Sequence, residues 1–184
     1  MPAVYPVFLI IPMAMCLGSF AWGMRRFFVR HGPMSLGLKA TTIAGLISAL
    51  LHGTVIVTSP QPTIAECSTG IALYSVSLLL FWWAEATNRG RPLAACFTPV
   101  GPTHITMSGP YRLVRHPFYC AYLLTWLAGL VGTGSLWLLP NMAAMSAIYG
   151  IAALKEEKQF SSGPLAVQYR EYRSRTGMFF PIFR

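Results

Sequence analysis

Charged residues are scarce in this chain: aspartate is absent, and glutamate occurs only five times among 184 residues. Charged side chains make up 10% of the sequence, whereas soluble domains carry about 25%. This composition excludes an ordinary water-soluble domain. The length of 184 residues leaves room for one membrane bundle and no second domain. Any site that needs a carboxylate must use one of the glutamates, Glu66, Glu85, Glu156, Glu157 and Glu171.

The four cysteines form no CxxC pair. Their spacing matches neither a disulfide framework nor a zinc site, so we interpret them as packing residues and expect no metal. The net charge of +9 is a feature of nucleic-acid-binding proteins as well. Here the basic residues lie beside apolar stretches and not along a soluble face, so we expect no nucleic-acid partner.

Five apolar stretches divide the chain, over about residues 4–23, 38–58, 69–86, 117–133 and 135–154. A helix needs about 20 apolar residues to cross a bilayer, within a range of roughly 17–25. We therefore predict an all-α, polytopic membrane bundle of about five transmembrane helices, forming a single domain over residues 1–184. Only a short glycine-containing turn joins the last two stretches, which predicts a tight helical hairpin.

All 14 lysines and arginines lie between the first and second stretches or at the very start of the second, between the third and fourth, or after the fifth. Loops rich in these residues stay in the cytoplasm. We therefore expect a multi-pass inner or cytoplasmic membrane protein with its N-terminus outside and its C-terminus cytoplasmic. Residues 160–176 mix apolar and charged side chains, which predicts an amphipathic helix at the interface, either an anchor or a lid. The apolar residues 178–183 are predicted to re-enter the bundle.

A basic and aromatic cluster stands where the fourth stretch begins, in the segment Arg115-His116-Pro117-Phe118-Tyr119. Proline suits the first position of a helix, where its missing N–H loses no hydrogen bond. A helix that starts at Pro117 directs its free N–H groups toward the preceding polar segment, where an anion could bind. The alternative is that Arg115 and His116 only mark the cytoplasmic end of a membrane span.

Two of the glutamates, Glu156 and Glu157, continue the fifth stretch at its cytoplasmic end. The predicted hairpin returns them to the level of Arg115 and His116. The four groups then form either a salt-bridge lattice or a site for a zwitterionic ligand, in which a glutamate binds the ammonium. From the helical phase we expect Glu156 to be the more buried and Glu157 to lie closer to the C-terminal segment.

The remaining glutamates have simpler interpretations. Glu85 and Arg89 stand at i,i+4, which predicts an ion pair on a helix surface. Glu66 falls in an outer loop, where solvation accounts for it.

One run of residues resembles a known family. Gly109-Pro110-Tyr111-Arg112-Leu113-Val114-Arg115-His116-Pro117-Phe118-Tyr119, with His104-Ile105-Thr106 before it and Glu156-Glu157 and Tyr169-x-x-Tyr172 after it, is similar to the isoprenylcysteine carboxyl methyltransferases, which are akin to the phospholipid N-methyltransferases. The resemblance covers about residues 80–181. It implies an integral membrane enzyme that binds S-adenosylmethionine in a cytosol-facing pocket, with a core over about residues 86–184, and an acceptor that enters from the bilayer.

The resemblance also implies roles for particular residues. Cofactor binding is implied for His104, Ile105, Tyr111, His116, Pro117, Tyr119, Glu156, Glu157 and Tyr169, and catalytic roles for Arg112, Arg115, Glu156 and Tyr172. Ala121 departs from the family pattern, which often has glycine there. The glycine-rich loop of soluble methyltransferases, G-x-G-x-x-G after a strand, does not occur.

The chemistry favours a lipophilic carboxylate as the acceptor. A carboxylate is already ionised at neutral pH, so it needs an orienting cation and no base. An amine lipid headgroup would have to lose a proton first, and it stays as an alternative. Two other classes stay open: an NADPH-dependent sterol-type reductase, which has a similar R-H-P-x-Y stretch, and a non-catalytic membrane accessory protein. We expect membrane lipids and a lipophilic substrate as partners.

Overall fold

The computed structural model describes residues 5–26, 28–29, 35–89, 93–94 and 104–182. These residues form an all-α fold whose α-helices are α1 (Tyr5–Arg26), α2 (Leu36–Thr58), α3 (Ile64–Thr87), α4 (Pro117–Thr133), α5 (Leu139–Ser162) and α6 (Ala166–Arg175). Two 3-10 turns, η1 (Gly109–Arg112) and η2 (Leu136–Leu138), precede α4 and α5. The strands β1 (Phe28–Val29) and β2 (Leu93–Ala94) form one short parallel pair.

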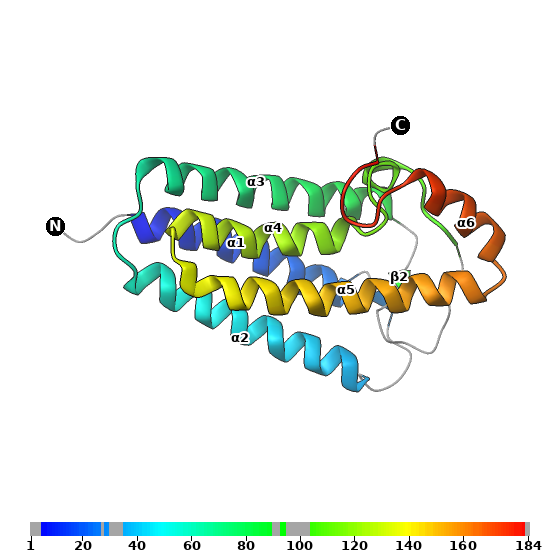
Figure 1. Ribbon diagram of the computed structural model, residues 1–184, viewed down its shortest axis with the longest axis horizontal. Coiled ribbons are helices and arrows are strands. Elements are labelled where there is room, and N and C mark those ends of the chain that lie inside the picture. The colour runs from blue at the N-terminus through cyan, green and yellow to red at the C-terminus, as the bar shows by residue number, and fades with distance from the viewer. Residues whose placement is uncertain (1–4, 27, 30–34, 90–92, 95–103, 183–184) are drawn as a thin grey trace.

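Helices α1 to α5 run along a common direction, and α6 with the C-terminal turn covers one end of the bundle (Figure 1). Four of the helices, α1, α2, α3 and α5, are long and apolar enough to cross a membrane. Helix α4 is apolar too, but its 17 residues make it the shortest of the five. It lies inside the bundle between α3 and α5, and its side chains therefore pack against both helices (Figure 1).

The closest packing joins α3 to α4. A Cβ atom added at Gly70 would overlap the backbone of Gly132, so glycine at both positions lets the two helices approach. Further along, the Ser77 hydroxyl donates to the Ala121 carbonyl at 2.6 Å, and it lies 2.8 Å from the Thr125 hydroxyl. These interactions place the N-terminus of α4 beside the C-terminus of α3, where the basic cluster lies.

The bounds of α4 agree with the sequence prediction at both ends. Pro117 occupies the first helical turn, and Gly134 caps the C-terminus with a φ of 62°. Only glycine adopts this left-handed conformation without steric cost, which explains the abrupt stop. The short η2 turn then reverses the chain into α5, so the predicted hairpin is present.

Two helices are longer than predicted. Helix α3 begins at Ile64 and not near residue 69, because Thr63 and Glu66 form a capping box. Glu66 is therefore a helix cap, and the interpretation that it is only solvated was wrong. Helix α5 continues to Ser162, eight residues past the predicted end of the apolar stretch, and the amphipathic helix shrinks to α6 because Gly163 interrupts the two.

A polar cluster lies inside the opposite half of the bundle, where α2 meets α5. The Ser48 hydroxyl donates to Oδ1 of Asn141 at 2.7 Å, and Nδ2 of Asn141 lies 3.0 Å from Nε2 of His52. Ser48 and His52 are buried. His52 also packs against Trp126 of α4, with ring centroids 5.1 Å apart. We call Ser48, His52 and Asn141 the neutral cluster.

Candidate functional site

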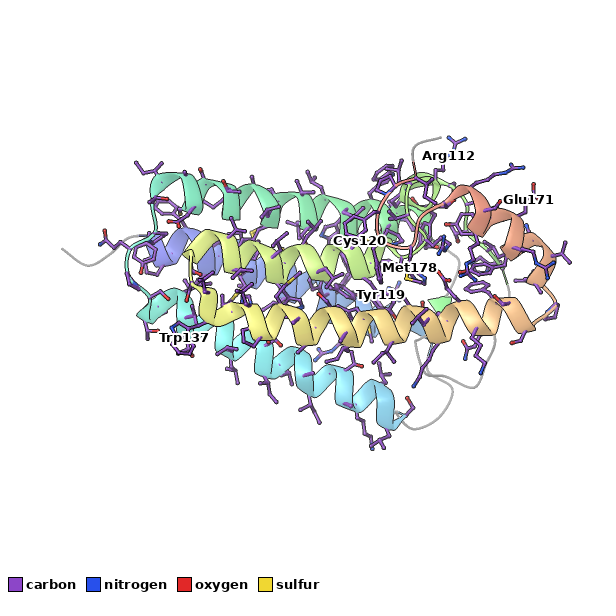
Figure 2. All side chains as sticks on the ribbon, in the orientation of Figure 1. Arg112, Tyr119, Cys120, Trp137, Glu171 and Met178 are labelled. Carbon is purple, nitrogen blue, oxygen red and sulfur yellow. The ribbon has the colours of Figure 1, made fainter. Side chains whose placement is uncertain are left out.

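The C-terminal turn folds back onto the start of α4. The backbone N–H of Arg115 donates to the Gly177 carbonyl at 2.8 Å, and that of His116 donates to the Met178 carbonyl at 3.2 Å. The Cys120 thiol lies 3.4 Å from the Phe179 carbonyl. These contacts agree with the prediction that residues 178–183 return to the bundle. Phe183, the last residue of that segment, lies outside the described residues. The turn covers the N-terminal end of α4, where Cys120 and Met178 lie (Figure 2).

The first charged contact of the site joins Arg115 to Glu157. Nε and Nη2 of Arg115 each lie 2.8 Å from Oε1 of Glu157, so the guanidinium forms a forked contact with one carboxylate oxygen. Nη1 of Arg115 donates to the carbonyl of Thr176, directly after α6. Both side chains are more than nine-tenths buried. A buried charge of this kind is tolerated only when it is paired.

His116 lies between the two glutamates. Its Nε2 is 3.3 Å from Oε1 of Glu157, and its Nδ1 is 3.4 Å from Oε2 of Glu156. Burial alone lowers the pKa of His116, but the hydrogen bonds and negative charges of Glu156 and Glu157 outweigh it. The pKa of His116 is therefore raised above its ordinary value, which favours the imidazolium form.

Glu156 has an environment different from that of its neighbour. The hydroxyl of Tyr119 donates to Oε1 of Glu156 at 2.6 Å, and the side chain of Glu156 is 25% exposed, against 4% for Glu157. The prediction that Glu156 is the more buried was wrong. The prediction that Glu157 lies closer to the C-terminal segment is confirmed, because Nε of Arg173 in α6 lies 3.7 Å from Oε2 of Glu157.

We call Arg115, His116, Tyr119, Glu156, Glu157 and Arg173 the charged cluster. Arg173 carries no signal of its role in the sequence, because it is one of three arginines in α6 and a single contact leaves no pattern. Its guanidinium is 57% exposed, so it has room for a further partner. In the charged cluster two carboxylates face two guanidinium groups and an imidazole.

Two tyrosines of α6 close the site from the side of the C-terminal segment. The hydroxyl of Tyr172 donates to the Tyr111 carbonyl at 2.7 Å, which ties α6 to η1. Burial raises the pKa of Tyr172 and of Tyr169. The nearby Arg115 charge lowers both values and the Glu157 charge raises them, but burial dominates. The hydroxyl of Tyr169 is buried without a hydrogen-bond partner among the described residues. Both tyrosines are thus neutral donors beside the glutamates.

A second polar group surrounds Tyr111 at the end of α3. Nδ2 of Asn88 donates to the Tyr111 hydroxyl at 2.9 Å, and the Thr106 hydroxyl donates to Oδ1 of Asn88 at 3.0 Å. This contact holds the segment from Thr106 to Tyr111 against α3. The two residues that precede Thr106, His104 and Ile105, are half-buried. They thus belong to the polar segment that Thr106 holds against α3.

Two of the predicted site residues, Pro117 and Arg112, are not members of the charged cluster, and neither is Ala121, at which the sequence departs from the family pattern. Pro117 is buried at the first turn of α4. We call η1, α6 and the C-terminal turn, which cover one end of the bundle, the cap. Arg112 is exposed on the α3 side of the cap, whereas Tyr119 lies between α4 and α5 (Figure 2). Ala121 is fully buried in the core of α3, α4 and α5, and its carbonyl accepts from Ser77. Its methyl group therefore packs in the core.

Glu85 is an exception to its predicted surface role. Its ion pair with Arg89 is present, with Nη2 and Oε2 3.5 Å apart, but the Glu85 side chain is only 4% exposed. The i,i+4 spacing identified the pair correctly and could not tell which partner faces the bundle. Among the described residues no group of three or more histidine, cysteine or acidic side chains is placed to hold a metal ion.

A comparison with protein-family models gave no match to this chain, and a comparison with curated proteins gave none either. The functional conclusion therefore depends on the geometry of the charged cluster and on the motif that contains Arg115 to Tyr119.

Proposed function

We propose that this chain is an integral membrane methyltransferase that transfers a methyl group from S-adenosylmethionine to a lipophilic acceptor. The observation that carries the proposal is the charged cluster itself. It gathers groups from α4, α5 and α6 at the basic end of the bundle, and charged side chains within a membrane protein mark functional sites. The amino-acid part of the cofactor carries one ammonium and one carboxylate, which complement a cluster that offers both signs of charge.

The proposed topology has five spans, with α4 as the shortest, an outside N-terminus and a cytoplasmic C-terminus. Of the basic residues, Arg30, Arg91 and Arg184 lie outside the described residues. The end of α3, the start of α4 and the far end of α5, which carry other basic residues, lie at the same end of the bundle (Figure 1). A reporter fused after Arg184 is expected in the cytoplasm, and one inserted at Gln61 is expected outside. A cytoplasmic reporter at Gln61 would contradict the five-span topology.

Glu156 is the group that we assign to the cofactor ammonium. Both oxygens of Glu157 already face cations. Glu156 is partly exposed, and among the described residues it is held by Tyr119 and His116. A carboxylate binds an ammonium with a charge-assisted hydrogen bond. Glu157 then has the lattice role that the sequence left as an alternative: it fixes Arg115 and His116.

His116 favours an acid over an amine as the acceptor. Both of its ring nitrogens face glutamate oxygens, and the two glutamates raise its pKa, which favours the protonated form. A protonated imidazole cannot accept a proton, so it is a poor base for an ammonium acceptor. A carboxylate acceptor needs only an orienting cation, and the exposed guanidinium of Arg173 is one such group.

When bound, the cofactor supplies the activated methyl group on a sulfonium. The chain's own contribution is to hold the acceptor in line with that group and to exclude water, because positioning and desolvation can supply most of the rate enhancement. Packed aromatic side chains beside the cluster help to exclude water, since Tyr119 stacks on Tyr149 with ring centroids 5.5 Å apart.

The proposal is tested with purified protein in detergent. S-adenosylmethionine and NADPH are titrated side by side, and a labelled methyl group is followed onto a prenylcysteine-like acid or an amine lipid. We expect saturable binding of S-adenosylmethionine and label on the acid. Label on the amine lipid alone would show that the acceptor is an amine lipid headgroup and not a carboxylate. Binding of NADPH alone would favour a reductase, and binding of neither would favour an accessory protein.

A further inference from the structure

The side chain of Arg112 is not used by the charged cluster. It is exposed at the end of η1, and none of the described residues accepts a hydrogen bond from it or pairs with it. It points away from the bundle on the α3 side, well apart from Tyr119 (Figure 2). A free guanidinium at this place is available to an anion outside the protein.

Exposed apolar side chains belong to the two chain segments that pair directly after Arg112. Leu113, the following residue, is 47% exposed, and Phe180 is 82% exposed. Phe180 belongs to the C-terminal turn, in which Gly177 bridges to Val114. The turn is tight, since a Cβ atom on Gly177 would overlap the Phe180 carbonyl. The cation and the two apolar groups thus belong to paired segments of the cap.

The level of this edge relative to the bilayer follows from α3. A Cβ atom on Gly109, at the start of η1, would collide with Thr87 at the end of α3, so the turn sits directly on that helix end. One helical turn earlier stand the exposed Trp82 and Trp83. Exposed tryptophans near the end of a membrane helix mark the headgroup level. Arg112 therefore lies just beyond that level, at the phosphate layer.

We infer that Arg112 and Leu113 form a binding site for an anionic phospholipid at the rim of the cap. The guanidinium pairs with the lipid phosphate, since its fork of N–H donors fits phosphate oxygens, and Leu113 and Phe180 contact the start of the acyl chains. The lipid would brace η1, and thereby Tyr111 and Tyr172, from the membrane side. This inference does not depend on the proposed methyltransferase function.

The test counts bound lipid by native mass spectrometry on the purified full chain, with dioleoylphosphatidylglycerol or dioleoylphosphatidylcholine added to the detergent. The wild type is expected to retain the anionic lipid more strongly. Arg112→Gln should weaken its binding about fivefold, the effect of one basic residue at a membrane surface. Arg112→Lys should keep most of the affinity, because it keeps the charge.

Arg175→Gln is the matched control. It removes the same charge from an exposed arginine, but Arg175 is already paired with Glu171 at 2.7 Å, so the loss should stay below about twofold. Leu113→Ser leaves the charge unchanged and should weaken both lipids about threefold. Equal losses for Arg112→Gln and Arg175→Gln, or no loss at Arg112 or Leu113, would overturn the inference. So would displacement of the lipid by inorganic phosphate at equal concentration, which indicates a site for soluble anions.

Discussion

The bundle contains two buried polar clusters, and their chemistry differs. The neutral cluster joins α2 to α5 through Ser48, His52 and Asn141. Its two hydrogen bonds connect a hydroxyl, an amide and an imidazole, without an acidic or guanidinium group. The charged cluster joins α4, α5 and α6 and includes Arg115, Glu156 and Glu157. The first lies in the half of the bundle away from α6, and the second lies beneath α6.

The difference indicates which cluster has a function beyond packing. Uncharged side chains that hydrogen-bond across helices are a common means of helix association in membranes. Burying paired charges costs desolvation energy, and apolar side chains of similar size in their place often stabilise a protein equally well or better. The neutral cluster is thus explained by the association of α2 with α5. The charged cluster needs a reason of another kind, and the proposed zwitterionic ligand would supply it.

The largest effect is expected from Glu157→Gln. The change leaves the buried guanidinium of Arg115 without a counter-charge, which should lower the free energy of unfolding by on the order of 3–5 kcal/mol. Melting curves of the purified protein in detergent measure it. Glu171→Gln is the control, since that exposed pair contributes at most about 1 kcal/mol. Similar melting temperatures for the two variants would remove Glu157 from the lattice role.

His116→Ala should act mainly on cofactor affinity. His116 orients Glu156 through its Nδ1, so its loss frees the proposed ammonium ligand. A lost charged or hydrogen-bonded contact is worth on the order of 1.5–3 kcal/mol, or roughly tenfold to a hundredfold in affinity for S-adenosylmethionine. Calorimetric titration measures it. Unchanged affinity in a folded variant would place His116 outside the binding site.

Asn141→Leu tests the neutral cluster. It removes the partner of both Ser48 and His52, and interhelical hydrogen bonds in membranes contribute about 0.6 kcal/mol, with a maximum near 1.7. We expect a small fall in melting temperature and unchanged affinity for S-adenosylmethionine. A loss of affinity as large as that of His116→Ala would show that the two clusters are coupled, and the comparison between them would fail.

The smallest effect is a pH dependence from His116. Its pKa is raised in the folded protein. Its contribution to stability is therefore fully present below the ordinary value near 6.5, and it is lost as the pH rises through the folded-state pKa. Melting temperatures of the wild type should fall across this range relative to those of His116→Gln. Parallel curves for the two proteins would show that His116 gains no stability from its glutamates.

The sequence predicted the end of the bundle at which the charged groups meet, but not the rotation of α5. Pro117 and Gly134 fix the ends of α4 by backbone chemistry, and that prediction is confirmed. The rotation of α5 depends on its packing, in which Tyr149, Ala153 and Glu157 form the buried stripe. Ala152 and Ala153 are both buried, so no apolar pattern distinguished Glu156 from Glu157.

Contacts between distant segments were also beyond the sequence. Asn88 and Thr106 carry no motif, and their bond depends on where η1 meets α3. His52 and Asn141 stand 89 residues apart, and each alone resembles an isolated polar residue in an apolar helix. Such pairs become recognisable only when the helices are placed side by side.

The central claim is that Glu156 is the ligand-facing carboxylate of the charged cluster. Calorimetric titration of S-adenosylmethionine into the wild type, Glu156→Gln and Asn141→Leu tests it, with melting curves taken on the same samples. We predict that Glu156→Gln loses roughly tenfold to a hundredfold in affinity while it keeps most of its thermal stability, because an amide accepts a hydrogen bond but carries no charge. Wild-type affinity in Glu156→Gln, together with a large drop in its melting temperature, would contradict the claim and leave the cluster as a salt-bridge lattice.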